Sequence, residues 1–179
     1  MKIKVGINGM GRIGRMIVRS IIESKNKNIE IKHINNRTSS EVCSKLLKYD
    51  SIHGIFEANI KFKKHYISIN NKIISYSQET ELKNIEWKNT DVDIVFECTG
   101  RFNTKKDLIT HIKNGAKKVI VSAPCSNADK TIVYGVNENN ITKNDKIISA
   151  ASCTTNCLAL VANILNDNFK ITNGFMTTI

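Results

Sequence analysis

The chain has 179 residues, 41% hydrophobic and 24% charged, which is the balance of a water-soluble globular protein with one full core. No apolar run approaches the roughly 18 residues of a membrane span, and the N-terminus lacks the apolar core of a signal peptide. We therefore expect a cytoplasmic protein with no membrane partner. The net charge of +11 comes from scattered lysines without an accompanying aromatic-basic motif, which is typical of a generally basic, solvated surface. The alternative is a field that attracts anionic ligands such as phosphorylated metabolites and dinucleotides, and nothing in the sequence supports a nucleic-acid role.

Cysteine and histidine usage limits the chemistry further. The five cysteines are odd in number and irregularly spaced, and the four histidines form no zinc-like cluster. This pattern predicts reduced thiols in a reducing compartment and no metal site.

Predicted elements alternate between strands and helices along the first part of the chain. Residues 2–8 and 29–34 are expected as strands, 12–24 as a helix, and 41–47 as a short helix capped by Ser39 or Ser40. Residues 59–77 differ, because two β-rich runs (66–69 and 72–76) flank Asn70-Asn71, a pair typical of a hairpin turn. The sequence thus predicts an antiparallel insertion within an α/β pattern.

The alternation then resumes. We expect strands at 92–96, 118–121, 131–134 and 146–149, a helix over 105–114 closed by Gly115, a helix from Cys153 through Leu165, and a final strand-like run at 174–179. The predicted fold class is α/β: a Rossmann-type, doubly wound, mostly parallel sheet with an antiparallel insertion. We expect this nucleotide-binding domain over 1–152 and the beginning of a second, catalytic domain over 153–179.

A glycine motif follows the first predicted strand. Gly9, Gly11 and Gly14 form GxGxxG, and they open the first predicted helix. Gly9 permits a tight turn, Gly11 a close backbone approach to a pyrophosphate, and Gly14 packing of the helix on the strand. Together with the free N–H groups of the helix, the motif predicts dinucleotide binding.

The end of the second strand bears on the choice of cofactor. An acidic residue is expected there in NAD-binding proteins, whereas this chain has Asn36 followed by Arg37. A neutral amide does not repel a 2′-phosphate and an arginine can pair with it, so NADP is favoured while NAD remains open. The alternative is that Asn36 only ends the strand and Arg37 is solvated.

The segment 149–157 places a thiol where a strand gives way to a helix. A cysteine at a helix N-terminus is stabilised as a thiolate, so Cys153 is a candidate nucleophile, with an inert buried thiol as the alternative. Cys157 lies on the same helix face and is expected to pack.

Several segments in order along the chain carry a family resemblance. The runs 5–15 (VGINGMGRIGR), 49–54 (YDSIHG), 97–102 (ECTGRF), 122–124 (SAP) and 150–157 (AASCTTNC) resemble the glyceraldehyde-3-phosphate dehydrogenases that require phosphate. The resemblance implies that the Cys153 thiolate attacks the aldehyde of glyceraldehyde 3-phosphate, that hydride passes to the nicotinamide, and that inorganic phosphate cleaves the resulting thioester. It also implies a homotetramer for the complete protein.

The resemblance extends to individual binding residues. Ser152 and Thr154 are expected to bind the substrate or the attacking phosphate, and Arg12 and Ile13 to contact the cofactor pyrophosphate. The remaining expected cofactor contacts are Thr99, Gly100, Phe102 and Ser122. His53 and His65 are interpreted as structural or exposed.

Two other functions fit the same residues. Erythrose-4-phosphate dehydrogenases share the cysteine motif, and the chain by itself is also interpreted as a cofactor-binding module without catalysis. The latter follows from the expectation that the family's catalytic histidine comes directly after Ile179, so that the fragment turns over negligibly.

Overall fold

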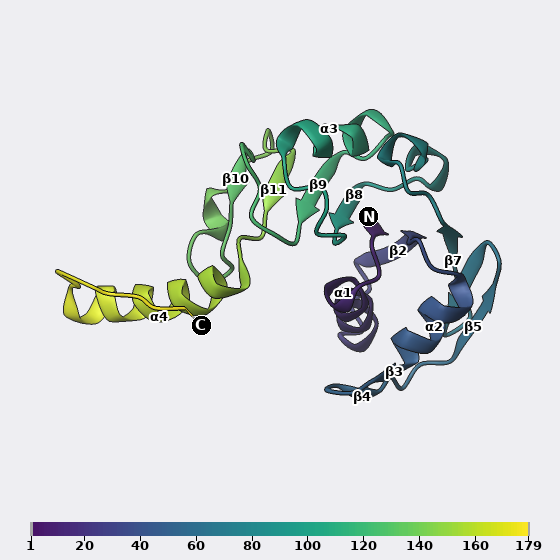
Figure 1. The fold of residues 1–179 in the computed structure, drawn as a ribbon, viewed down its shortest axis with the longest axis horizontal. Helices are drawn as coiled ribbons and strands as arrows, with labels where there is room; N and C mark the ends of the chain where they lie inside the picture. Colours follow the sequence, from purple (N-terminus) through teal and green to yellow (C-terminus); the bar gives the residue numbers. More distant parts are fainter. Residues whose placement is uncertain (1, 179) are drawn as a thin grey trace.

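The computed structural model describes residues 2–178 and is built on a nine-stranded sheet with the order β10-β11-β9-β8-β1-β2-β7-β6-β5 (Figure 1). The strands from β10 to β7 in this order are parallel, and β6 and β5 are antiparallel to their neighbours. The predicted fold class, mostly parallel with an antiparallel portion, is therefore confirmed. The strands are β1 (Ile3–Asn8), β2 (Ile29–Asn35), β5 (Ile60–Lys63), β6 (Tyr66–Ile69), β7 (Lys72–Ser77), β8 (Ile94–Glu97), β9 (Lys118–Val121), β10 (Lys130–Thr131) and β11 (Ile147–Ser149).

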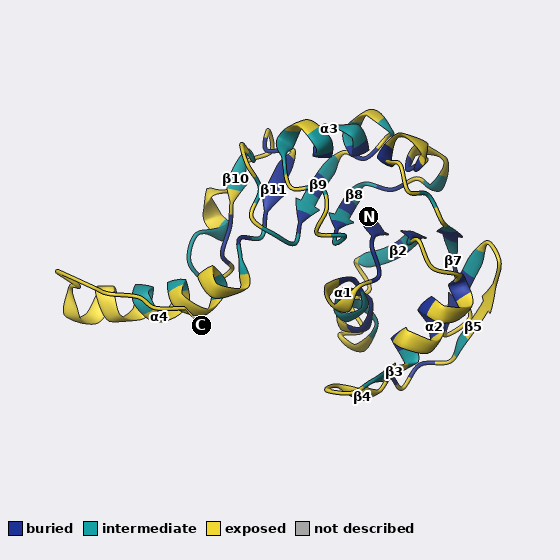
Figure 2. Cartoon of the chain, viewed as in Figure 1, coloured by how far each residue is buried: buried dark blue, intermediate teal, exposed yellow. Residues whose placement is uncertain are grey.

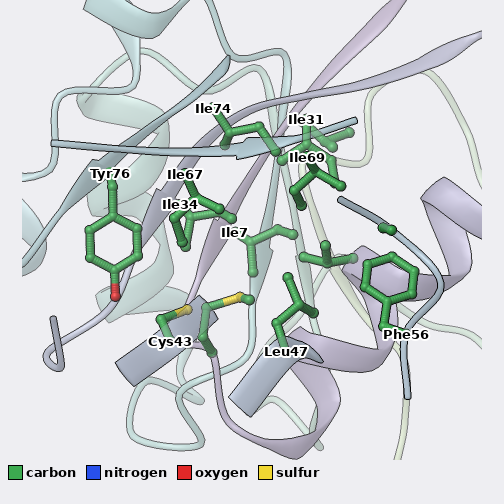
Figure 3. Packing of buried hydrophobic residues seen from close by; sticks show 14 residues of the cluster. Ile7, Ile31, Ile34, Cys43, Leu47, Phe56, Ile67, Ile69, Ile74 and Tyr76 are labelled. Carbon is green, nitrogen blue, oxygen red and sulfur yellow. The ribbon is translucent and has the colours of Figure 1, made fainter. Parts of the chain in front are cut away.

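Helices cover both faces of this sheet, as a doubly wound fold requires. Side chains alternate along β1, so that Val5 and Ile7 enter a core shared with α1 and α2 (Figure 3). On the opposite face, Val119 and Val121 of β9 pack with Leu108 of α3. The helices are α1 (Arg12–Glu23), α2 (Ser40–Lys48), α3 (Lys105–Lys113) and α4 (Cys153–Phe169), with 3-10 turns η1 (Leu82–Asn84), η2 (Lys88–Thr90) and η3 (Glu138–Asn140).

The predicted hairpin is formed by β6 and β7. Asn70 and Asn71 have φ values of 50° and 64°, the left-handed conformations that a two-residue hairpin turn needs. The local turn chemistry therefore fixes the register. What it does not predict is that β7 also joins β2 in parallel, which attaches the insertion to the main sheet.

A second sheet of two short strands, β3 (Tyr49–Asp50) and β4 (Gly54–Ile55), was not predicted. It is held by the buried side chain of Arg19 in α1, whose guanidinium donates to the carbonyls of Leu47, Lys48 and Gly54. Strands of two residues carry no periodicity, so only the tertiary contacts reveal them.

Helix α4 begins at Cys153 as predicted, but it projects from the sheet and is mostly exposed (Figures 1 and 2). The strand predicted over 174–179 is wrong for 174–178, which are irregular; residue 179 lies outside the described residues. Among residues 2–178, no strand pairs with the backbone groups of 174–178. The strand predicted over 131–134 likewise reduces to β10. Between residues 2 and 178, no helix is long and apolar enough to cross a membrane.

Candidate cofactor cavity and reactive cysteine

A cavity of about 300 Å³ opens at the carboxyl ends of β1, β2 and β8. In an open parallel sheet this edge is where ligands bind, and β1 is the point at which the strand order changes direction. Of the predicted cofactor residues, the structure brings six together in its wall: Gly9, Gly11, Asn36, Arg37, Thr99 and Phe102.

The glycine turn forms one wall of the cavity, and two of its glycines are required by geometry. Gly9 has a φ of +93°, and a Cβ there would lie 2.8 Å from the Thr99 backbone nitrogen. A Cβ on Gly14 would lie 2.0 Å from the Gly9 carbonyl oxygen and 3.5 Å from the Ile7 side chain, so only glycine lets the start of helix α1 approach the turn this closely. At Gly11 a Cβ would meet no atom within 4 Å, so the backbone there faces open space and is accessible.

The first turn of α1 is free of competing anions. Its N-cap, Gly11, offers no side chain, and the first turn carries no acidic residue. The positive end of the helix dipole therefore has no acidic side chain of its own helix beside it, as an anion site requires. Arg12 and Ile13 are exposed in this turn, outside the cavity wall.

At the end of β2, Asn36 connects two parts of the site. Its Oδ1 accepts a hydrogen bond from the backbone N–H of Met10 (3.1 Å), and its Nδ2 donates to Thr38 Oγ1 (2.6 Å). Arg37 is exposed in the same wall and forms no ion pair among residues 2–178. The charged wall residues are Arg37, Arg101 and Glu79, so the cavity is net positive.

The loop after β8 supplies the opposite wall. Thr99 and Phe102 line the cavity, whereas Gly100 is exposed with a φ of +71° and does not line it. Ser122 lies behind this wall, because its backbone N–H donates to the carbonyl of Glu97 (3.0 Å) and it does not line the cavity.

The candidate nucleophile leaves the sheet at this same edge. Cys153 follows β11, which is separated from β8 only by β9, and it is exposed at the first position of α4. Ala151 turns the chain with a φ of +60°, a left-handed conformation that costs a non-glycine residue roughly 1–2 kcal/mol. Neighbouring strands lie about 5 Å apart, so β11 and β8 are on the order of 10 Å from each other.

The other residues of the cysteine segment stabilise the helix start. Ser152 Oγ accepts from the Thr155 backbone N–H (3.0 Å) and lies 3.0 Å from Thr154 Oγ1. Asn156 Nδ2 donates to the carbonyls of Ala150 (2.8 Å) and Ser152 (2.9 Å). Ser152 also lines a shallow cavity of about 370 Å³ with Cys125, and Thr154 is exposed outside it.

Burial separates the five thiols. It raises the pKa of Cys43 to about 11 and that of Cys98 to about 12, so both are protonated and unreactive near neutral pH. Cys153 is exposed at a helix N-terminus. Cys157 is exposed as well, so the packing expected for it is not found.

Comparison of this sequence with models of known protein families identifies the family to which the chain belongs. Residues 3–105 match the family model "Glyceraldehyde 3-phosphate dehydrogenase, NAD binding domain", and residues 152–179 match the corresponding C-terminal domain. This chain belongs to the glyceraldehyde 3-phosphate dehydrogenase family.

Full-length members of the family show the same relationship. The chain is 46% identical over its whole length to the glyceraldehyde-3-phosphate dehydrogenases of Cereibacter sphaeroides and Geobacillus stearothermophilus, and covers 53% of each. It is 43% identical to that of Clostridium acetobutylicum, with 98% of the chain and 52% of the relative covered. The chain thus spans about half the length of the curated relatives it matches.

Sequence reasoning missed the polar residues beneath the cavity of this family member. Asn8, Asn35 and Glu97 are each the last residue of a strand, each directly follows an apolar residue, and all three are buried. Since buried polar groups need partners, a polar residue that directly follows an apolar one at the end of a predicted strand could have identified them. Among residues 2–178, no group of three or more His, Cys, Asp or Glu side chains is arranged to hold a metal ion.

Proposed function

We propose that this chain supplies the dinucleotide-binding part and the nucleophile of a phosphorylating glyceraldehyde-3-phosphate dehydrogenase. The observation that carries the proposal is the placement of the glycine turn, with its uncapped helix, and of Cys153 at one edge of the same sheet. Family membership supports it. The complete enzyme would be a cytoplasmic homotetramer acting on a phosphorylated aldehyde and inorganic phosphate.

Each part of the site has a distinct task in this proposal. The N–H groups at the start of α1, near Arg12 and Ile13, hold the pyrophosphate, while Gly11 leaves room for it. Cys153 sulfur adds to the aldehyde carbon and later holds the acyl group as a thioester until phosphate displaces it. Ser152 and Thr154 bind the substrate or that phosphate. The bound NAD or NADP supplies the hydride acceptor. Thr99 and Phe102 contact the dinucleotide from the cavity wall, with Gly100 beside them and Ser122 behind.

For the cofactor, we propose that NADP is accepted as well as NAD. The amide of Asn36 carries no charge to repel a 2′-phosphate, and the unpaired guanidinium of Arg37 stands beside it in the wall. In this proposal Arg37→Gln weakens NADP binding about tenfold, the loss of one charge-assisted contact, and leaves NAD binding unchanged. Asn36→Asp shifts the preference toward NAD.

Isothermal titration of the purified chain with NAD⁺ and with NADP⁺ tests both parts of this proposal. Arg101→Gln is the matched control, because Arg101 lines the same cavity but belongs to the loop after β8 and lies over the Phe102 ring. Binding of neither dinucleotide would reject the function. Equal losses of NADP binding in Arg37→Gln and Arg101→Gln would reject the role of Arg37 alone.

For turnover, we propose that residues 1–179 bind the cofactor but oxidise the aldehyde negligibly by themselves. No histidine of residues 2–178 hydrogen bonds with Cys153: His33 lies in β2 and His111 in α3, while His53 and His65 lie in turns. Without a neighbouring base, proton transfer during oxidation is slow. Following NADPH formation with glyceraldehyde 3-phosphate and phosphate tests this, and robust turnover would contradict it.

A further inference from the structure

A buried hydrogen-bonded network lies directly beneath the cavity. It runs from Trp87 through His111 of α3 to Glu97 of β8, and on to Asn8 of β1 and Asn35 of β2. Trp87 and His111 are completely buried and Glu97 is 1% exposed. Three separate strand ends and one helix are therefore joined by polar contacts, and the Trp87, His111 and Glu97 part of the network is shielded from solvent.

The direction of the hydrogen bonds is fixed at the Trp87 end. An indole N–H can only donate, and Trp87 Nε1 lies 2.9 Å from His111 Nδ1, so this ring nitrogen accepts. His111 therefore carries its hydrogen on Nε2, which lies 2.9 Å from Glu97 Oε2 and donates to it. His111 is thus neutral, in a single tautomer.

Glu97 accepts four hydrogen bonds. Oε2 receives those from His111 and from Asn8 Nδ2 (2.6 Å), and Oε1 receives those from the Thr99 backbone N–H (2.8 Å) and the Thr99 hydroxyl (2.5 Å). The His111, Asn8 and backbone N–H groups can only donate, and an ionised carboxylate accepts all four bonds without a hydrogen of its own. A buried charge so completely paired is one that can be retained.

The network reaches the cavity through three of its members. Asn8, Asn35 and Thr99 line the cavity wall, whereas Glu97 lies behind them. Asn8 Oδ1 accepts from Asn35 Nδ2 (2.8 Å), and Asn8 Nδ2 donates to Glu97, so Asn8 is held from both sides. Asn35 is itself oriented by the Glu79 backbone, whose N–H donates to its Oδ1 (2.8 Å). The carboxylate therefore holds two of the three polar wall residues directly, Thr99 and Asn8.

We propose that Glu97 is a positioning residue of the dinucleotide cavity, whose ionised carboxylate fixes Thr99 and Asn8 in the orientation that binds the cofactor. This inference rests on the proposed function. A glutamine at position 97 would turn an NH₂ group toward donors, either those of Thr99 or those of Asn8 and His111. His111 cannot relieve this by changing tautomer, because Trp87 holds its Nδ1 as an acceptor.

The test compares dinucleotide affinity with stability. Glu97→Gln in the 179-residue chain is expected to weaken NAD⁺ and NADP⁺ binding about tenfold or more in calorimetric titration. Asp145→Asn is the matched control, because Asp145 accepts from the Thr142 backbone N–H (2.6 Å) and hydroxyl (2.9 Å) in the same manner, but outside the cavity. It should lower the melting temperature and leave the affinity unchanged.

Two further experiments distinguish a positioning role of Glu97 from a general loss of structure: a double variant that restores a carboxylate, and a pair of conservative substitutions at Thr99. In the double variant Asn8→Asp, Glu97→Gln, the carboxylate introduced at position 8 accepts from Asn35 and from the amide introduced at position 97, so part of the affinity should return. Where Glu97→Gln does not fold, Thr99→Ser keeps the hydroxyl donor and should bind as the parent does, whereas Thr99→Val should bind more weakly.

Three results would overturn the inference. The first is unchanged affinity in Glu97→Gln or, where that variant does not fold, equal affinity in Thr99→Ser and Thr99→Val. The second is an equal loss of affinity in Asp145→Asn, which would mean that Glu97 acts through stability alone. In the third, the parent chain binds neither dinucleotide, and this outcome rejects the proposed function together with the role of Glu97.

Discussion

Most apolar side chains of strand β1 are buried, whereas those of helix α4 are largely exposed. Val5 and Ile7 of β1 are buried between helices and neighbouring strands, whereas Val161 and Ile164 of α4 are 54% and 61% exposed. The cofactor cavity is therefore shaped by packing within this chain, with polar contacts beneath it. The nucleophile stands on a helix held by its own backbone hydrogen bonds and its cap. The cofactor cavity is thus held in place by tertiary packing, whereas Cys153 is held in place mainly by the local structure of helix α4.

The largest expected difference concerns the core. Ile7→Ala should lower the free energy of unfolding by about 2–5 kcal/mol, because it leaves a cavity in a fully buried cluster. Ile164→Ala, at an exposed position of α4, should change it by less than about 0.5 kcal/mol. Denaturant titration followed by Trp87 fluorescence measures both. Similar losses in the two variants would mean that α4 packs on the sheet in solution.

The next largest expected difference is in thiol reactivity between the sheet region and helix α4. At neutral pH, Cys43 should be alkylated about a hundredfold more slowly than an ordinary exposed thiol, because burial raises its pKa from 9.0 to about 11. Cys98, with its pKa raised to about 12, should react more slowly still. Cys153 and Cys157 are exposed and should be modified first. Timed iodoacetamide labelling with peptide mass spectrometry checks the order, and early labelling of Cys43 would contradict the packing of α2.

Acid should destabilise the sheet region through a buried histidine. Burial lowers the pKa of His33 from 6.5 to about 4, so between these values the unfolded chain binds a proton that the folded chain does not. Stability is then complete above pH 6.5 and falls toward pH 4, by roughly 2 kcal/mol between pH 7 and pH 5. Urea titrations at several pH values measure the slope. His33→Gln should flatten it, and an unchanged slope in that variant would assign the effect to another group.

The smallest expected difference is between the effects of removing the N-caps of helices α2 and α4. Ser39 caps α2 and Ser152 caps α4, each accepting from a backbone N–H three residues on. Either change to alanine should cost about 1 kcal/mol locally. Ser39→Ala should lower the unfolding midpoint of the whole domain, whereas Ser152→Ala should only speed amide exchange in the first turn of α4. Hydrogen exchange of Val42 and Thr155 distinguishes the two, and a global loss in Ser152→Ala would contradict the independence of α4.

Local sequence patterns predicted much of the fold because their causes are local. Two asparagines at the left-handed positions of a turn specify the β6–β7 hairpin, and Gly9 and Gly14 are the residues that the turn before α1 allows. The prediction of a strand at 174–178 was wrong because its formation does not depend on local sequence alone. A β-rich run forms a strand only where another strand pairs with it.

The sequence by itself determined the α/β alternation, the glycine turn and the helix that begins at Cys153, since each depends on residues within one turn or strand. Only the tertiary structure decided the place of β7 beside β2, the burial that separates the five thiols, and the network from Trp87 to Asn35. The partners in that network are up to 89 residues apart, as with Asn8 and Glu97. Their meeting depends on strand order, which no local pattern encodes.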